Sequence, residues 1–312
     1  MAPESSPSNL RKWLIAGRPW SFPASTMPVV FGTSLGVVIG GARFSWIDFL
    51  LALAAMVVLH AASNMTSDAV DFRRGLDREV TPVGGAVVRG WLTPSEAVAG
   101  GAVCFAAGSL IGLVLAVRTG WALVLIGAVG LPIGIFYPFL KYRAFGDLAV
   151  FLNFGLLGSL GAWTVQTKRL SWIPVVWAVP MAMLVIAILH ANNWRDAVTD
   201  TERRVKTVAG LLGDEGSLKY YHVLVFGPFL ILLALMLLPR LGVRVTAMPL
   251  TFFVTLLALP SALELSRRAR RRTAPRRPLD FVILDGATAN YNLVFGLLCT
   301  AAVWLHLLVQ GN

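Results

Sequence analysis

Charged residues are scarce in this sequence, and acidic residues are the scarcest. Only 14% of the 312 residues are charged, with 16 Asp and Glu against 27 Lys and Arg. Soluble globular domains carry charges on about a quarter of their residues. With 56% hydrophobic residues and a mean hydropathy of +0.71, the composition excludes a soluble globular domain. The lipid bilayer is therefore the expected solvent.

Cysteine and linker sequence are also nearly absent. The two cysteines, Cys104 and Cys299, fall inside apolar runs, which favours small packing residues over a disulfide or a metal pair. No stretch rich in Pro, Gly and Ser is long enough to separate two domains. We expect a mobile polar segment over 1–17 and a single transmembrane domain over 18–312. The first ten residues lack the pattern of a cleavable signal, so the first apolar helix is expected to be retained.

Long hydrophobic runs fill the rest of the chain. A helix rises about 1.5 Å per residue, so about 20 apolar residues cross the hydrocarbon core. Windows of that length predict an all-α membrane protein with nine transmembrane helices in one bundle around a central cavity. The windows are 22–38, 47–63, 100–117, 121–140, 148–165, 173–191, 220–238, 247–263 and 287–308.

The distribution of Lys and Arg predicts an orientation. Most of the 27 basic residues fall in segments that share one side if the N-terminus is inside, which places the N-terminus in the cytoplasm and the C-terminus outside. The net charge of +11 is then explained without nucleic acid. The arginine-rich segment 267–277 is interpreted as a basic face toward anionic lipid headgroups.

Two segments on the predicted inner side share one pattern. The segments 64–93 and 192–219 are predicted to be long loops, and both begin with Asn, then Asp four residues on, Ala-Val, and a further Asp. A doubled arginine follows each. Because four predicted helices separate the copies, both emerge on the same side and can face each other across a cavity. The shared residues are Asn64, Asp68 and Asp71 in the first copy, and Asn192, Asp196 and Asp200 in the second.

The paired aspartates suit a metal site. If the helices continue into these segments, each pair lies on one helical face. Mg²⁺ takes one or two carboxylates and completes its octahedron with water and substrate phosphate, so two half-sites would hold a diphosphate through two Mg²⁺ ions. Basic residues close in sequence are candidates for a phosphate clamp: Arg73, Arg74, Arg195, Arg204 and Lys206.

The apolar helices below these segments suit a diphosphate with a long hydrocarbon tail. Loss of metal-bound diphosphate from an allylic carbon leaves a cation, which an electron-rich aromatic ring captures if water is excluded. The alternative interpretation of one Asp/Arg pair is a solvated helix end, but two matching copies favour a substrate site. Asn64, Asn192 and Asn193 are candidate metal or substrate ligands, with hydrogen bonding between helices as the alternative.

Other polar residues are more ambiguous. His60 and His190 could touch the acceptor, although a lone His in a span is more often a packing residue. Asp147 could pair locally or reach the site. Glycines at four-residue spacing predict a face for close helix packing: Gly32, Gly36 and Gly40.

Several stretches resemble the UbiA superfamily of intramembrane prenyltransferases, and the match runs from about residue 18 to the end. They are Arg18-Pro19-Trp20-Ser21-Phe22-Pro23-Ala24, Asp68 to Asp77, Tyr142-Arg143-Ala144-Phe145-Gly146-Asp147-Leu148, Asn192-Asn193-Trp194-Arg195-Asp196 and Thr288-Ala289. The resemblance implies nine helices and Asp-rich motifs that bind Mg²⁺ and prenyl diphosphate. It adds Asp77 to the metal ligands and Tyr142 and Arg143 to the diphosphate site.

Within the superfamily, the flanking stretches are most similar to 1,4-dihydroxy-2-naphthoate prenyltransferases. This branch implies transfer of a polyprenyl chain to an aromatic acceptor in menaquinone biosynthesis, in a bacterial inner membrane. Two positions depart from the family pattern. Ser67 replaces a common Asn, and Arg204-Val205-Lys206 replaces the usual Gly-Lys pair. The alternatives are a UbiA-type enzyme with another aromatic acceptor, a UbiA-type terpene cyclase and, on the internal duplication, a transporter.

Overall fold

The computed structural model describes the chain apart from residues 1–6, 77–79, 81–83, 245, 272–281 and 311–312. The described part is helical, and its one isolated β-bridge joins Arg143 to Lys206. In chain order the helices are α1 (Asn9–Gly17), η1 (Pro19–Ser21), α2 (Pro23–Val38), α3 (Trp46–Arg73), α4 (Pro94–Thr119), α5 (Trp121–Lys141), α6 (Gly146–Val150), the π-helical η2 (Phe151–Leu157), α7 (Gly158–Thr167), α8 (Ile173–Glu202), α9 (Val208–Leu237), η3 (Leu238–Leu241), η4 (Leu250–Ala258), α10 (Leu259–Arg270) and α11 (Val282–Gln310).

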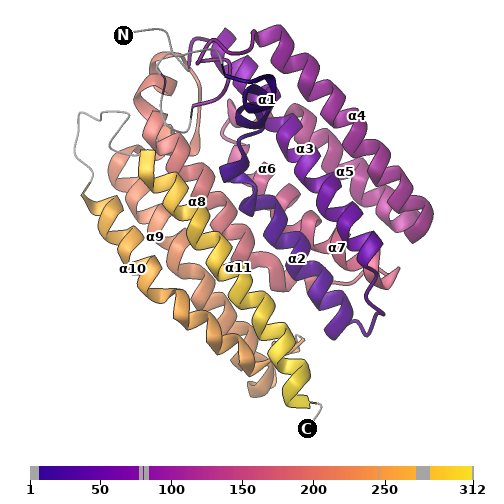
Figure 1. The fold of residues 1–312 in the computed structure, drawn as a ribbon. Coiled ribbons are helices and arrows are strands. Elements are labelled where there is room, and N and C mark those ends of the chain that lie inside the picture. The colour runs from indigo at the N-terminus through magenta and orange to yellow at the C-terminus, as the bar shows by residue number, and fades with distance from the viewer. Residues whose placement is uncertain (1–6, 77–79, 81–83, 245, 272–281, 311–312) are drawn as a thin grey trace.

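The number of spans agrees with the prediction from hydropathy. Among the described residues, eight helices are long and apolar enough to cross a membrane, and the bent pair Asn9–Ser21 and Pro23–Val38 makes a ninth. Figure 1 shows the long helices running side by side between two ends, with α1 lying at one of them. The chain is an integral membrane protein built as one helical bundle.

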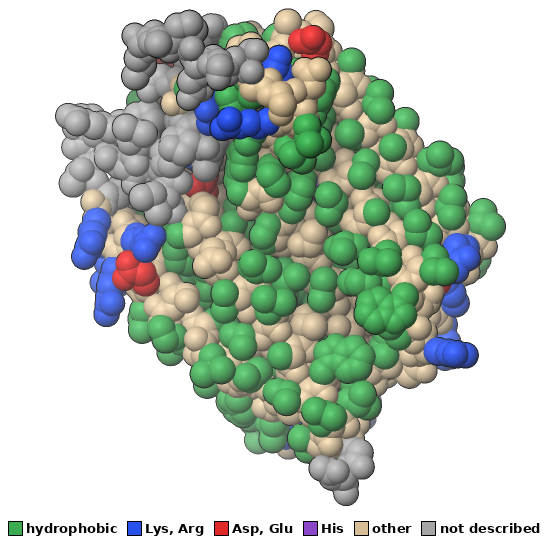
Figure 2. All heavy atoms as spheres, in the orientation of Figure 1, with side chains coloured by type: hydrophobic (Ala, Val, Ile, Leu, Met, Phe, Trp, Pro, Cys, Tyr) green, Lys and Arg blue, Asp and Glu red, His purple; other side chains and the backbone are tan. Residues whose placement is uncertain are grey.

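The outside of the bundle carries many exposed apolar side chains. Figure 2 shows a broad hydrophobic surface, with Lys and Arg side chains toward its edges. Helix α8 is the central helix, since 61% of its apolar window is buried, whereas only 6% of the window of α5 is buried. Lipid tails are as apolar as the exposed leucines and valines, so this surface needs no protein cover.

The predicted close-packing face is confirmed. A Cβ atom built on Gly32 of α2 would lie 2.2 Å from the Ser159 carbonyl oxygen of α7, so only glycine permits this approach. Gly36 and Gly40, one and two turns further along, face Trp163 and Thr167 of the same helix.

The helices extend further than hydropathy indicated. The segments 64–93 and 192–219 were predicted to be loops, but α3 continues to Arg73 and α8 to Glu202. Helix α9 also begins early, at Val208, with a kink at Gly213. Polar residues lower the hydropathy of these helix ends without ending the helix, because their side chains find partners on neighbouring segments. Helix α4 also begins earlier than its apolar window, at Pro94, where Thr93 and Glu96 form a capping box.

Candidate active site

The first aspartate motif lies on the last three turns of α3. Asp68 is fully buried, and its carboxylate accepts a hydrogen bond from the Arg18 guanidinium at 3.0 Å and another from the Val87 backbone N–H at 3.0 Å. Arg18 occupies the left-handed turn between α1 and α2, with φ +53°. Two segments far apart in the chain therefore fix the position of this carboxylate.

A glycine allows the loop after α3 to cover Asp68. A Cβ atom on Gly85 would lie 2.1 Å from an Asp68 carboxylate oxygen, a distance no side chain tolerates. Any larger residue at position 85 would push this loop off the carboxylate. The Val87 N–H therefore depends on Gly85 for its position.

Asp71 lies one turn further along the same face of α3. Its carboxylate accepts a hydrogen bond from the Tyr142 hydroxyl at 2.6 Å and pairs with the Lys141 ammonium at 3.2 Å. Burial and the adjacent Asp71 carboxylate raise the pKa of Tyr142 above its usual range, so the phenol remains a donor. The Arg74 guanidinium covers the Tyr142 ring at 4.2 Å from its centroid.

The second aspartate motif lies at the C-terminal end of α8, which the distribution of basic residues predicts to be on the cytoplasmic side. The Arg195 guanidinium donates two hydrogen bonds to Asp196, at 2.9 and 2.8 Å, and a third to Asp285 of α11 at 2.8 Å. The Asn192 amide also points to Asp285, at 3.4 Å. Arg195 therefore joins the second motif to the last helix.

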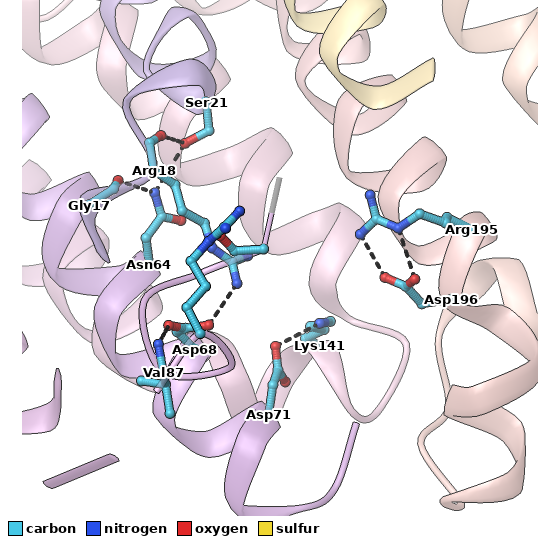
Figure 3. Close-up of polar contacts among 12 residues, drawn as sticks. Gly17, Arg18, Ser21, Asn64, Asp68, Asp71, Val87, Lys141, Arg195 and Asp196 are labelled. Atoms are coloured by element: carbon cyan, nitrogen blue, oxygen red, sulfur yellow. Dashed lines mark hydrogen bonds and ion pairs between the residues drawn. The ribbon is translucent and has the colours of Figure 1, made fainter. Parts of the chain in front are cut away.

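Lys141 connects the two motifs. Its ammonium contacts Asp71 and interacts electrostatically with Asp200, the second aspartate of α8. Figure 3 shows Asp71 of α3 and Asp196 of α8 with Lys141 between them. The prediction that the two copies share one end of the bundle and face each other is consistent with this arrangement.

A cavity of about 120 Å³ opens beside Asp71 and Lys141, and Asp71 is the one aspartate of the two motifs that lines it. Its wall combines cations, carboxylates and amides with apolar and aromatic side chains from deeper in the bundle. The polar part includes Arg18, Asn64, Asp71, Lys141, Asn192 and Asp285, and the apolar part includes Ala24, Val150, Phe154, Val185, Ile188 and Leu189. A ligand with a charged head and a hydrocarbon body matches this division.

The predicted site residues are not all placed alike. Asn64 and Asn192 line the cavity, and the Asn64 amide is held by the Gly17 carbonyl at 2.8 Å and by Ser21 at 3.0 Å. Asn193 is buried on another face of α8. Five predicted phosphate-binding residues are exposed, and none of them lines the cavity: Arg73, Arg74, Arg143, Arg204 and Lys206. Asp77 lies outside the described residues.

Four ionisable wall residues were missed as site residues by the sequence analysis: Arg18, Tyr137, Lys141 and Asp285. Tyr137 and Lys141 lie one turn apart on α5, and this spacing of two polar residues at the end of an apolar span was an available signal. Asp285 was a further signal, because an ionisable residue at the edge of a span usually marks a functional site.

The structure distinguishes the three polar residues whose roles the sequence left open. His60 lines the cavity, where its ring nitrogens contact Ser25 at 2.8 Å and Ser21 at 3.3 Å. His190 is buried against the Tyr220 ring at 4.8 Å, away from the cavity wall. Asp147 is buried and does not line the cavity either. Of these three residues, His60 alone is placed to touch a ligand there.

The donor set fits a hard cation that a substrate helps to hold. In the part of the chain that the structure describes, no three acidic, His or Cys residues gather into a complete metal cage. Mg²⁺ usually needs only one or two carboxylates from the protein, because phosphate and water supply its other ligands. The carboxylates of α3 and α8 are ligands of the type that such an ion takes.

Comparisons with known proteins agree with this geometry. A profile of the UbiA prenyltransferase family matches residues 27–284. The chain belongs to the UbiA prenyltransferase family. It is 34% identical over 299 residues to UbiA prenyltransferase domain-containing protein 1 of Danio rerio, covering 93% of this chain and 83% of that protein. It is 32% identical to the Drosophila melanogaster homolog, covering 94% and 79%. The sequence resemblance to the superfamily is confirmed.

Solved structures share the fold of this UbiA family member at low sequence identity. The apo structure of a UbiA homolog from Aeropyrum pernix K1 has a TM-score of 0.64 at 18% identity, covering 90% of this chain and 97% of that one. A UbiA homolog from Archaeoglobus fulgidus bound to DMAPP and Mg²⁺ has a TM-score of 0.61 at 16% identity, covering 93% and 99%. The relatives named here do not single out the naphthoate branch.

Proposed function

We propose that this protein transfers a prenyl group from an isoprenoid diphosphate to an aromatic acceptor, with Mg²⁺ as cofactor. The observation that carries the proposal is the cavity wall, which brings the Asp71–Lys141 ion pair, at 3.2 Å, together with apolar side chains. The Archaeoglobus homolog, which binds DMAPP and Mg²⁺, supports the same choice of ligand.

Asp68, Asp71, Asp196 and Asp200 would hold the Mg²⁺, which would supply Lewis-acid stabilisation of the diphosphate leaving group. Lys141 and Arg18 neutralise the diphosphate as it leaves, because both are positioned by their aspartate partners before substrate arrives. The apolar wall keeps water from the cation that remains. His60 and Tyr137, which line the cavity below Lys141, flank the position of an acceptor ring.

The proposed acceptor is 1,4-dihydroxy-2-naphthoate, which would make the reaction a step of menaquinone biosynthesis. The support is the similarity of the stretches at 18–24, 142–148 and 192–196 to that branch. The orientation proposed from the basic residues places the aspartate end of the bundle in the cytoplasm. We also propose that the protein lies in a bacterial inner membrane.

The test is a reaction with purified protein, Mg²⁺, a long-chain all-trans prenyl diphosphate and each of two acceptors. We expect diphosphate release and a prenylated, decarboxylated naphthoquinol with 1,4-dihydroxy-2-naphthoate, and little product with 4-hydroxybenzoate. Mass spectrometry of the lipid extract identifies the product. A prenylated benzoate would refute the acceptor and keep the reaction class. A cyclic hydrocarbon formed without acceptor would refute transfer in favour of cyclisation.

A further inference from the structure

Helix α1 carries an apolar stripe that the described chain leaves exposed. Leu10 is 71% exposed and Leu14 is 55% exposed, and Trp13 beside them is 38% exposed. Their spacing of three and four residues places them on one side of the helix. Ala16, by contrast, is fully buried and packs with Met65 of α3. The helix therefore has one side docked on the bundle and an apolar stripe directed away from it.

The position of α1 is that of a helix at the membrane surface. The segment Asn9–Ser21 is bent by 61° from α2, and Figure 1 shows α1 at one end of the bundle. The 16 residues of α2 rise about 24 Å, which is most of a hydrocarbon core of about 30 Å. Helix α1 is therefore placed at the level of the lipid headgroups. An apolar stripe with basic residues beside it is typical of a helix that lies in this layer.

The charges around α1 are mainly positive. Arg11 and Lys12 belong to the helix itself, and Arg89 lies beside it, because the guanidinium groups of Arg11 and Arg89 are 5.7 and 5.1 Å from the centre of one ring, that of Trp91. The acidic group that interacts with Lys12 is Glu96 of α4. Three cations against one carboxylate favour an anionic neighbour, such as a lipid phosphate. A second copy of this chain would instead bring like charges together.

The C-terminal end of α1 is joined to the first aspartate motif. The Asn64 amide of α3 donates to the Gly17 carbonyl at 2.8 Å. Arg18, the left-handed residue that caps α1, pairs with Asp68 at 3.0 Å. Movement of α1 off the bundle would withdraw Gly17 and Arg18 from these partners. The position of α1 and the geometry of the site therefore depend on each other.

We propose that α1 binds the anionic lipid surface of the membrane and thereby keeps Arg18 in contact with Asp68, so that anionic lipid raises the rate of the reaction. Leu10 and Leu14 enter the headgroup layer, and Arg11 and Lys12 contact lipid phosphates. The location of α1 is independent of the function proposed above, whereas the effect on the rate rests on it.

Spin labels in nanodiscs of phosphatidylcholine and phosphatidylglycerol test the location. One label is placed at Leu14→Cys, one at Leu110→Cys on the lipid-facing side of α4, and one at Glu215→Cys, an exposed charged position of α9. All three are made with Cys104→Ala, because Cys104 is the less buried native cysteine. Oxygen concentrates among lipid tails, and a nickel chelate stays in water. The oxygen-to-nickel accessibility ratio at Leu14 should lie well above that at Glu215 and below that at Leu110.

The effect on the rate is tested by diphosphate release from prenyl diphosphate, with Mg²⁺ and acceptor, in two kinds of nanodisc. Wild type should be about threefold faster or more in an equal mixture of phosphatidylcholine and phosphatidylglycerol than in phosphatidylcholine alone. Arg11→Gln/Lys12→Gln should lose this difference. The control Lys219→Gln/Arg267→Gln removes two exposed cations from α9 and α10 and should keep it.

The remaining outcomes each contradict a stated part of the inference. A label at Leu14 that behaves like the one at Glu215 would place α1 in water, and a label shielded from both reagents would mean that protein covers it, as in a dimer. Equal wild-type rates in the two lipid mixtures, or loss of the difference in the control alone, would refute the role of α1 in the lipid effect. Absence of diphosphate release in every nanodisc would refute the proposed function, while the spin labels would still decide where α1 lies.

Discussion

The two aspartate motifs are similar in sequence, but in the structure their side chains differ in their partners and in their exposure. On α3, Asp68 and Asp71 are buried and contact Arg18, Val87, Lys141 and Tyr142, all from other segments. On α8, the side chain of Asp196 is 34% exposed and pairs with Arg195, its neighbour in the chain. Asp68 and Asp71 are thus built into the fold, whereas Asp196, unlike the buried Asp200 of the same motif, retains room to adjust to a ligand.

Because of this difference, substitutions in the two motifs should reduce activity alike but affect stability differently. Asp68→Asn and Asp196→Asn should both reduce turnover by about a hundredfold or more, since each removes a charge that binds metal. Asp68→Asn should also lower the free energy of unfolding by about 2 kcal/mol, because it breaks a buried ion pair with Arg18. Asp196→Asn should leave stability almost unchanged. Thermal unfolding in detergent and diphosphate release measure the two effects.

Equal stability of the two variants would contradict the contrast between the motifs. Full activity in either purified variant would contradict the proposed diphosphate site itself.

Removal of divalent metal with EDTA is the corresponding test on wild type, and it should abolish turnover until Mg²⁺ is restored.

Lys141 is the group that both motifs share, so its loss should affect them together. Lys141→Gln should lower kcat/KM by about a hundredfold, because a cation positioned for the leaving diphosphate is lost. Lys219→Gln is the matched control, since Lys219 forms an exposed pair with Glu215 that contributes little. If Lys141→Gln changed only KM, Lys141 would bind the substrate without acting on the leaving group.

Gly85 tests how far the α3 motif depends on the loop that covers it. Gly85→Ala would place a methyl group 2.1 Å from a carboxylate oxygen of Asp68, so the loop must move away. We expect about a tenfold loss of kcat/KM as the Val87 N–H leaves the carboxylate. Gly210→Ala is the control, because a Cβ atom there would make only ordinary contacts, at 3.4 Å, with Thr201 and Thr207. Unchanged activity in Gly85→Ala would show that the function of Asp68 does not depend on the loop that covers it.

The sequence predicted what depends on local pattern. Hydropathy located the spans, the repeat located both motifs, and the four-residue spacing of Gly32, Gly36 and Gly40 indicated the contact of α2 with α7. It could not predict that Arg18 reaches Asp68, fifty positions away, or that Asp285 meets Arg195. Those pairs depend on how the helices pack. Basic residues adjacent to the motifs in sequence were therefore favoured over distant ones that line the cavity.

The exposed arginines behind the motifs should give the smallest effect. Arg73 contacts Ser95 at 3.3 Å and lies outside the cavity wall, so it is placed to attract an anionic substrate and not to hold it. Arg73→Gln should raise KM for prenyl diphosphate by about threefold at low ionic strength, and the effect should shrink with added salt, because the attraction of an exposed charge is screened beyond about 10 Å at 0.1 M. The kcat should not change. Steady-state kinetics at two salt concentrations measure both constants. A salt-independent fall in kcat would instead mean that Arg73 turns inward when substrate binds and completes the clamp that the sequence predicted.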